Sequence, residues 1–396
     1  MAGVGYEHIL TLNAGQTQLD RLYRVVFVTG DGVGGEGGRK TRKDWENVKG
    51  GGFMPALQRA IRRMGHYTYT VPWDAPNIPT TEPTLQGEEG RVDMFVLVWT
   101  PAQTYVTMPS FISHTHAKVI LYIGWNYVTE ERQEQREGEM VEWEKVMATI
   151  LRYCHALVFP THWAKEKWLA HWSNEVLPIT PLFVIGRWVE PAYYYPSPPL
   201  TLSLIPSQYP TSARLPSNLC SVLPPSWGMS DLSESIQVFR SLVDNLDCGK
   251  FAFKLALPFQ DTHPYSSNHT LTQYPNEYSV YVHNDTQMGM FWRGCDVFVA
   301  WDVGGVKSDG WLEGHMLAAI ATRIPIVAPD VGLYKELIRG GGEVYERGDG
   351  VGSSLKKGLE ETVCKVVNRY DTYIRMLPSY DINSIAEEYI QFIHAV

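Results

Sequence analysis

Short apolar runs alternate with amphipathic segments along most of the chain. In the first half, the runs with the length and residue content of buried strands lie at 24–29, 67–71, 92–99, 117–125 and 155–160. The segments with apolar residues at helical spacing lie at about 53–64, 134–153 and 163–172. Short strands that alternate with helices predict a parallel, doubly wound sheet.

Closely spaced prolines interrupt this pattern between residues 191 and 225. Proline at this density continues neither a helix nor a central strand, so we expect a connection between two domains. The alternation then returns and ends in an amphipathic helix. The predicted units are an N-terminal domain at 1–195 joined by a C-terminal helix at 380–396, a linker at 196–225 and a second domain at 226–379. The predicted fold class is α/β, with two Rossmann-like domains that face each other across a cleft.

Length and cysteine content add to this picture. A chain of 396 residues exceeds what one hydrophobic core usually serves, which supports two domains. Five scattered cysteines with no Cys-x-x-Cys pair predict reduced thiols, without a zinc site or a disulfide framework. The first residues show no basic segment followed by an apolar one, and no run of about 18 apolar residues occurs. We therefore expect a cytoplasmic protein without a transmembrane segment.

Charge is unevenly distributed. The formal net charge of −9 argues against a protein that binds nucleic acid over its whole surface. Residues 39–63, however, carry eight basic and two acidic side chains. This excess fits a surface that faces phosphates, and equally a solvated helix face beside a basic loop. A nucleic-acid partner therefore remains a minor alternative.

A glycine-rich loop follows the first predicted strand, with Gly34 and Gly35 at its centre and Arg39 and Lys40 beyond them. Glycine lets backbone N–H groups approach a phosphate or a sugar closely. The loop is too long for the dinucleotide fingerprint and contains no Gly-Lys-Ser/Thr sequence. Two interpretations stay open: a surface loop without a ligand, or a lid that contacts phosphate and acceptor.

A second stretch with candidate chemistry runs from residue 296 to residue 332. An apolar strand is followed by a loop with Lys307 and Asp309, an alanine-rich helix that contains Glu313, and another apolar strand. Ligands of open α/β sheets bind at such strand-to-helix turns. Asp309 also fits an N-cap, and Glu313 in the first turn can simply complement the helix dipole. His315 on the same helix fits a packed side chain.

Four ordered groups of segments carry a family likeness. They are RRMGHYTYTV at 62–71, CHALVFPTHWAKEKWL at 154–169 with PLFVIGRWVEPAYYY at 181–195, GMSDLSESIQVFRSLV at 228–243, and RGCDVFVAW at 293–301 with IPIVAPDVGLYKELI at 324–338. In this order they resemble motifs of the GT-B glycosyltransferases, and of glycosyltransferase family 4 in particular. The resemblance spans roughly residues 24–345 and implies the GT-B fold.

The donor motif departs from the family pattern. The resemblance implies two glutamates, but their expected positions fall on Gly310 and Ala318, which leaves Asp309 and Glu313 as carboxylates for sugar and ribose. The family's basic pair for the diphosphate is absent from LPPSWGMSDL. The cations left to replace it are Lys307, Lys254 and Arg293.

The resemblance implies hexosyl or pentosyl transfer from a UDP- or GDP-linked sugar to a hydroxyl acceptor such as a saccharide. It also implies retention of configuration, with no metal and no cofactor besides the nucleotide-sugar substrate. The candidate catalytic residues are Asp309, Lys307 and, as a base for an inverting reaction, His116. The candidate donor-binding residues are Gly34, Gly35, Gly310, Trp311, Glu313, Gly314, Lys254 and Trp227. The candidate acceptor-binding residues are Arg39, Lys40, Trp125 and Asn126.

Two other functions fit the sequence. The basic excess at 39–63 fits a glycosyltransferase whose acceptor is rich in phosphate, such as modified DNA or a lipid-linked sugar. The departures in the donor motif fit a GT-B-shaped protein that binds a nucleotide sugar, or serves as a partner subunit, without catalysis.

Overall fold

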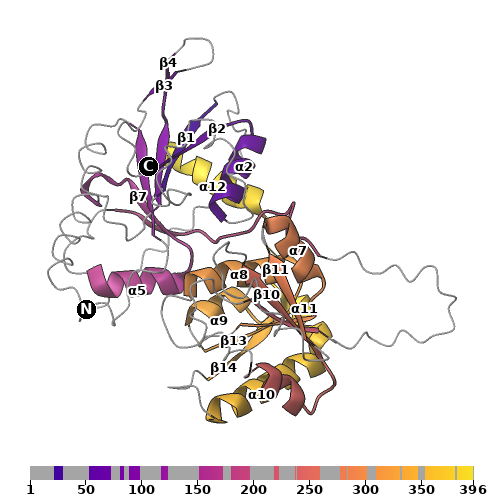
Figure 1. Cartoon of the computed structure of the whole chain (residues 1–396). Coiled ribbons are helices and arrows are strands. Elements are labelled where there is room, and N and C mark those ends of the chain that lie inside the picture. The colour runs from indigo at the N-terminus through magenta and orange to yellow at the C-terminus, as the bar shows by residue number, and fades with distance from the viewer. Residues whose placement is uncertain are drawn as a thin grey trace, which may run out of the picture.

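A computed structural model gives the fold of the chain (Figure 1). The residues that it describes are 22–29, 53–72, 81–83, 89–98, 117–123, 151–172, 180–196, 218–222, 237, 239–258, 277–282, 284–300, 309–330, 332–346, 353–379 and 381–395. Two six-stranded parallel sheets with helices on their faces make up this part of the chain.

The first sheet has the strand order β2-β1-β5-β6-β7-β8, and all its neighbouring strands run parallel. Its strands are β1 (Arg24–Thr29), β2 (Tyr67–Pro72), β5 (Met94–Val98), β6 (Lys118–Tyr122), β7 (Ala156–Phe159) and β8 (Leu182–Val184). A short antiparallel pair, β3 (Thr81–Pro83) and β4 (Glu89–Arg91), precedes β5 in the chain. The strands predicted for this half are confirmed.

The second sheet has the order β11-β10-β9-β12-β13-β14 and is also parallel throughout. Its strands are β9 (Asn218–Val222), β10 (Ala252–Pro258), β11 (Glu277–Val282), β12 (Val297–Val299), β13 (Ile326–Pro329) and β14 (Gly342–Tyr345). The chain builds outward from β9 in one direction and then from β12 in the other, which is the Rossmann order. The predicted α/β class with two Rossmann-like units is confirmed.

Both faces of the first sheet are buried. Val25 and Phe27 of β1 belong to one apolar cluster, while Val26 and Val28 belong to another. Strands of a parallel sheet need this double cover, which explains their nearly continuous apolar sequence. The cluster with Val25 continues into the second domain, where it includes Phe298 of β12 and Ile326 of β13. Apolar packing therefore runs through the contact between the domains.

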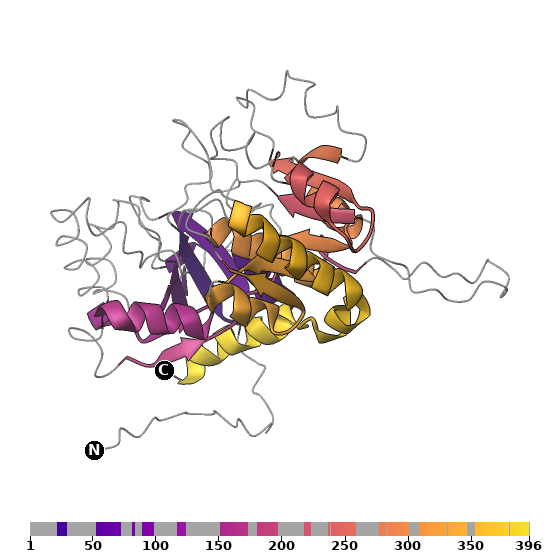
Figure 2. The ribbon, with the colours of Figure 1, turned by 90° about the horizontal axis from the view of Figure 1, so that it is seen from below.

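The described helices cover the faces of the two sheets. They are α2 (Phe53–Arg63), α5 (His162–Trp172), α7 (Asp285–Arg293), α8 (Asp309–Ala321), α9 (Gly332–Ile338), α10 (Ser353–Asn368), α11 (Tyr370–Met376) and α12 (Ile382–Ala395). In Figure 2 the orange and gold helices of the second domain, α8 to α10, lie against its sheet. None of the described helices is long and apolar enough to cross a membrane.

The last helix, α12, returns to the first domain and packs against α2 (Figure 1). The assignment of the C-terminal helix to the N-terminal domain stays a prediction. Most of the linker expected at 196–225 lies outside the described residues, so the domain boundaries stay predictions. The helix expected at 134–153 is described only over its last residues, 151–153.

A carboxylate of the second domain holds the first turn of α5. Glu336 accepts hydrogen bonds from the backbone N–H groups of His162 at 2.8 Å and Trp163 at 2.9 Å. The Thr161 hydroxyl accepts from the N–H of Ala164 at 3.1 Å. The first N–H groups of a helix have no partner within the helix, and its positive end favours an anion. The α9 carboxylate therefore completes the amino end of α5 across the domain contact.

The segment that leaves the first domain crosses α7. The Tyr194 hydroxyl donates to Asp285 at 2.8 Å, and Arg293 donates to the backbone oxygen of Tyr193 at 3.2 Å. Gly289 lies beneath this segment, and a Cβ added there would be 2.2 Å from the Tyr193 oxygen. Only glycine allows α7 to approach the segment so closely.

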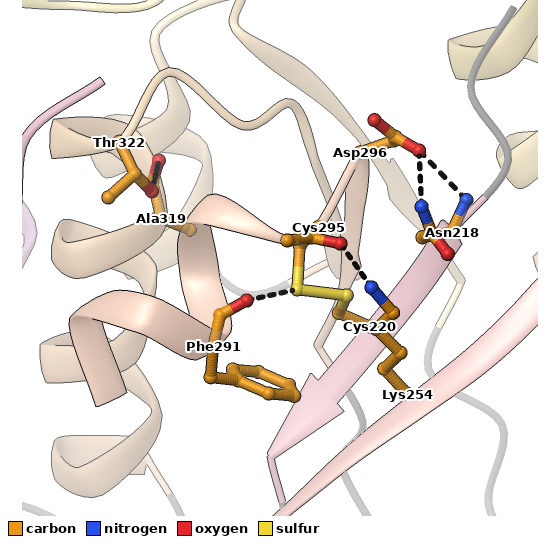
Figure 3. The surroundings of a disulfide bond; sticks show 9 residues. Asn218, Cys220, Lys254, Phe291, Cys295, Asp296, Ala319 and Thr322 are labelled. Atoms are coloured by element: carbon orange, nitrogen blue, oxygen red, sulfur yellow. Dashed lines mark hydrogen bonds between the residues drawn. A yellow bond between two sulfur atoms is a disulfide. The ribbon is translucent and has the colours of Figure 1, made fainter. Parts of the chain in front are cut away.

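Two disulfides lie in the second domain, so the prediction of reduced cysteines without a disulfide framework was wrong. Cys220 of β9 is bonded to Cys295, just before β12 (Figure 3). Cys248 is bonded to Cys364 of α10. The paired residues are 75 and 116 positions apart, and only the fold brings their Cα atoms to 5.8 and 5.4 Å. The fifth cysteine, Cys154, is free and buried, and burial raises the pKa of its thiol.

Candidate functional site

The strand order of each sheet reverses at one point, between β1 and β5 in the first sheet and between β9 and β12 in the second. Ligands of open α/β sheets bind outside the carboxyl ends of the strands at such a point. In the second sheet, α8 is the helix that follows β12 in the chain, and it begins at Asp309. The amino end of α8 is therefore where the topology predicts a ligand.

α8 is packed on most of its sides. Its apolar residues include Leu312 and Met316, which are 1% and 0% exposed. Ala318 is buried as well, so a glutamate at that position would meet the apolar core instead of a ligand. Gly314 is exposed, and a Cβ added there would meet nothing within 4 Å. The Glu313 side chain, in contrast, is completely buried, and a carboxylate removed from water needs a compensating charge or hydrogen bonds.

Arg187 supplies that charge from the other domain. Its Nη1 atom lies 2.7 Å from Glu313 Oε2. Arg187 follows β8 closely in the chain, and its Nε–H donates to the hydroxyl of Tyr122, the last residue of β6. The guanidinium also lies over the rings of Tyr122 and Phe53, 5.1 and 5.8 Å from their centroids. We call Tyr122, Arg187 and Glu313 the junction triad, because it joins the carboxyl edge of the first sheet to α8.

The electrostatics of the junction triad favour a charged arginine beside a neutral phenol. Burial works to lower the pKa of Arg187, but the Glu313 carboxylate and Tyr122 outweigh it and raise the pKa. Burial raises the pKa of Tyr122, more than the guanidinium lowers it. A buried ion pair seldom adds much stability, because desolvation offsets its attraction. The cost of keeping this pair suggests a role beyond packing.

A second tyrosine lies near the junction triad. The Tyr389 side chain of α12 is completely buried, and its hydroxyl makes no hydrogen bond within the described part of the chain. Burial and the neighbouring Tyr122 raise the pKa of Tyr389, which the Arg187 charge opposes. The C-terminal helix thus contributes to the surroundings of Arg187.

Of the predicted site residues, the structure brings Glu313 and Gly314 to the first turns of α8. Asp309, Gly310 and Trp311 form the start of the same helix, and their side chains lie outside the described residues. The other candidates that lie outside the described residues are Gly34, Gly35, Arg39, Lys40, His116, Trp125, Asn126, Trp227 and Lys307. Their roles stay predictions.

Lys254 is not brought to α8. Its ammonium group donates to the backbone oxygen of Gly294 at 2.7 Å, ahead of β12 and beside the Cys220–Cys295 disulfide (Figure 3). This position lies toward the amino-terminal edge of the sheet, whereas ligands bind at the carboxyl edge. The geometry therefore gives no support to a donor contact by Lys254.

Two further candidates have structural partners. Arg293 donates to Tyr193 and lies 4.3 Å from the ring centroid of Tyr195. His315 lies beside Trp292, with 6.2 Å between the ring centroids. Burial lowers the pKa of His315 to about 3, so its ring is neutral at ordinary pH. These contacts agree with the packing interpretation of His315.

Part of the basic excess at 39–63 is used within the protein. Arg59 and Arg63 lie 2.5 and 3.5 Å from the carboxylate of Glu190, which is 2% exposed. Arg62 donates to the hydroxyl and the backbone oxygen of Thr68. The three described cations of this region therefore hold α2 in place, and the other five basic residues lie outside the described part.

Sequence reasoning missed Arg187, Tyr122 and Glu336. Arg187 carried a signal, because it stands in the GRWVE segment where the resembled family has Asn-Gly-Val-Asp. Tyr122 carried none, since a tyrosine at the end of an apolar strand is common. Glu336 lies in the segment IPIVAPDVGLYKELI, which carries the family likeness, but its contact with α5 depends on how the domains meet.

Comparison with known proteins gives the fold its class. No protein-family model and no curated protein matches the sequence. Solved structures do match. A trehalose-6-phosphate protein from E. coli bound with UDP-2-fluoro glucose is 12% identical, with 94% of this chain and 99% of that chain covered and a TM-score of 0.53. The catalytic domain of starch synthase IV from Arabidopsis thaliana, bound to ADP and acarbose, is 11% identical, with 94% and 99% covered and a TM-score of 0.53.

A third similar structure is a protein from Listeria monocytogenes with a proposed UDP-N-acetylglucosamine 2-epimerase activity. It is 12% identical, with 95% of this chain and 96% of that chain covered and a TM-score of 0.52. At such identities the likeness concerns the fold. The chain has the GT-B fold, as the sequence predicted, while membership of glycosyltransferase family 4 stays a prediction.

Proposed function

We propose that this protein is a glycosyltransferase that moves a sugar from a nucleotide-sugar donor to a hydroxyl acceptor. The observation that carries the proposal is the junction triad, in which the buried Glu313 of α8 meets Arg187 at the carboxyl edges of both sheets. In a GT-B fold this is where a nucleotide diphosphate and its sugar would lie between the domains. The amino end of α8 favours the negative diphosphate.

The proposed reaction retains the configuration of the sugar and needs no metal. The bond between the anomeric carbon and the diphosphate oxygen breaks, and a bond to the acceptor oxygen forms on the same face. The acceptor proton passes to the leaving diphosphate. Catalysis then consists of stabilising charge that develops on the diphosphate, with Lys307, Gly34 and Gly35 as the remaining candidates. Asp309 would orient the transferred sugar.

Two of the structures with this fold were solved with bound ligands that fit the proposal. The E. coli protein carries UDP-2-fluoro glucose, and the starch synthase domain carries ADP and acarbose. Together with the predicted UDP- or GDP-linked sugars, these ligands indicate that UDP-, GDP- and ADP-sugars should all be tested as donors. The Listeria protein shows that one fold also accommodates a proposed epimerase, so the activity has to be argued from the site.

The alternative with a phosphate-rich acceptor is weaker. Arg59 is held by a close ion pair with Glu190, so part of the basic excess that motivated this alternative is used inside the protein. The non-catalytic alternative remains, because the donor motif departs from the resembled family. Assays of turnover separate it from transfer.

The cytoplasmic location is less well supported than the sequence suggested. Disulfides are rare in reducing compartments, and the second domain has two of them. The two disulfides of the second domain therefore fit an oxidising compartment better than they fit the cytoplasm. Mass spectrometry of the alkylated, non-reduced protein would measure how much of each disulfide is present in the cell.

A donor and acceptor screen tests the proposed function. The protein is incubated with UDP-, GDP- and ADP-sugars and a set of saccharide acceptors, and products are read by mass spectrometry. We expect one donor class to lose its sugar to an acceptor, with release of the nucleoside diphosphate. An isomerised donor without transfer would instead show an epimerase, and binding without any product would support the non-catalytic alternative.

A further inference from the structure

We propose that Arg187 is the residue through which the first domain binds the diphosphate of the donor. This rests on the proposed function and adds a phosphate-binding role to a residue that was not among the predicted site residues. The junction triad gives the guanidinium a fixed orientation and leaves part of it for a ligand.

The hydrogen-bonding capacity of Arg187 is only partly used. A guanidinium has five N–H donors. In the described part of the chain, Nε–H donates to Tyr122 and one Nη1–H donates to Glu313. No hydrogen bond of the described residues uses the Nη2 edge, and 20% of the side chain is exposed. The remaining N–H groups can therefore meet an anion.

The contacts of Arg187 fix its plane. Glu313 holds one end, Tyr122 holds Nε, and the ring of Phe53 lies 5.8 Å from the guanidinium carbon. An arginine held in this way loses little conformational freedom when it binds an oxyanion. Its planar fork suits two phosphate oxygens at once, which a lysine ammonium does not match.

The position of Arg187 also fits a diphosphate. Glu313 is the fifth residue of α8, so its Cα lies about 6 Å along the axis from that of Asp309. Helical side chains lean toward the amino end, which brings the paired guanidinium closer to the first turn. A diphosphate at the amino end of α8 would then meet both the helix N–H groups and Arg187.

The second domain needs such a contribution from outside. The resembled family holds the diphosphate with a basic pair after the first strand of its second domain, but residues 223–232 here read LPPSWGMSDL and contain no lysine or arginine. A guanidinium from the first domain would restore positive charge there. It would also make donor binding depend on the contact between the domains.

Calorimetric titration of wild type and Arg187→Met with pairs of nucleotides that differ only in the number of phosphates tests this proposal. UDP is compared with UMP, GDP with GMP and ADP with AMP. Loss of charge-assisted hydrogen bonds predicts an increase of about 10- to 100-fold in the Kd of the diphosphate that binds. The Kd of the monophosphate should rise much less. Arg187→Lys, which keeps the charge without the fork, should give an intermediate loss.

Glu336→Ala is the matched control, because it removes a contact between the domains that does not involve Arg187. A purely structural role would weaken diphosphate and monophosphate by equal factors, as this control should. Equal factors in Arg187→Met, or no loss at all, overturn the role of Arg187 and leave the proposed function intact. If wild type binds none of the diphosphates, both are wrong. If Arg187→Met does not fold, Arg187→Gln and Arg187→Lys give the same readout.

Discussion

The contact between α7 and the segment that leaves the first domain makes a sharp prediction about one glycine. Gly289 lies within α7, where alanine is normally the better residue. A Cβ at this position, however, would lie 2.2 Å from the Tyr193 oxygen and 3.1 Å from its carbonyl carbon. Gly289→Ala therefore has two opposite effects: alanine favours the helix, but its Cβ overlaps with backbone atoms of Tyr193.

The two effects differ enough to decide the sign. Replacing glycine by alanine inside a helix raises the free energy of unfolding by about 1 kcal/mol. Overpacking of a buried contact typically lowers it by about 1–3 kcal/mol, and a backbone carbonyl has little room to move. Gly358 of α10 offers a matched control, since a Cβ there meets nothing within 4 Å. We expect Gly358→Ala to stabilise the protein and Gly289→Ala to destabilise it.

Urea unfolding followed by circular dichroism measures both variants against wild type. Limited proteolysis adds a local readout, because loss of the α7 contact should make the bonds near Tyr193 easier to cleave. If Gly289→Ala is as stable as Gly358→Ala and no more sensitive to protease, the close approach of α7 to Tyr193 is wrong.

Three further predictions concern stability. Glu336→Ala leaves the first turn of α5 without its anion and should lower the free energy of unfolding by about 1–2 kcal/mol. Urea unfolding measures this loss, and a gain in stability would contradict the prediction. His315 has a folded-state pKa of about 3, below its ordinary value of 6.5, so stability should fall as pH drops below 6.5. From pH 7 to pH 5 wild type should lose about 2 kcal/mol more than His315→Leu, and parallel pH curves would refute this. The Cys248–Cys364 disulfide joins positions 116 residues apart, so replacing both cysteines by serine should lower the free energy of unfolding by up to about 5 kcal/mol on the chain-entropy account. Thermal unfolding without reductant compares this variant with wild type. Equal melting temperatures would show that the disulfide is not formed.

The fold was readable from the sequence because its signals are local. The strand Arg24–Thr29 has apolar residues at all four of its central positions, so both of its faces are apolar. Such a run suits a strand that is covered on both sides of the sheet. The proline-rich break and the return of the alternation after it indicated a second unit. Strand order was not local in this sense, but short connections and right-handed crossovers leave few choices.

The candidate site was readable only in part. Glu313 was predicted because it is the carboxylate one helical turn beyond Asp309 in the segment that resembles the family's donor motif. Its partner Arg187 is 126 positions away and reaches it only because the two domains meet. The same applies to Cys220 and Cys295, whose pairing depends on the adjacency of β9 and β12. Contacts of this kind depend on tertiary structure and leave no periodic trace in the sequence.

Hydrogen-exchange mass spectrometry with and without a nucleotide sugar tests the central claim most directly. The claim is that the donor binds where α8 meets the segment after β8, beside Arg187 and Glu313. We expect the donor to slow amide exchange in peptides that cover residues 185–190 and 309–316, and to leave the region around the Cys248–Cys364 disulfide unchanged. Protection confined to other parts of the chain, or no protection with any donor at saturating concentration, would contradict the account.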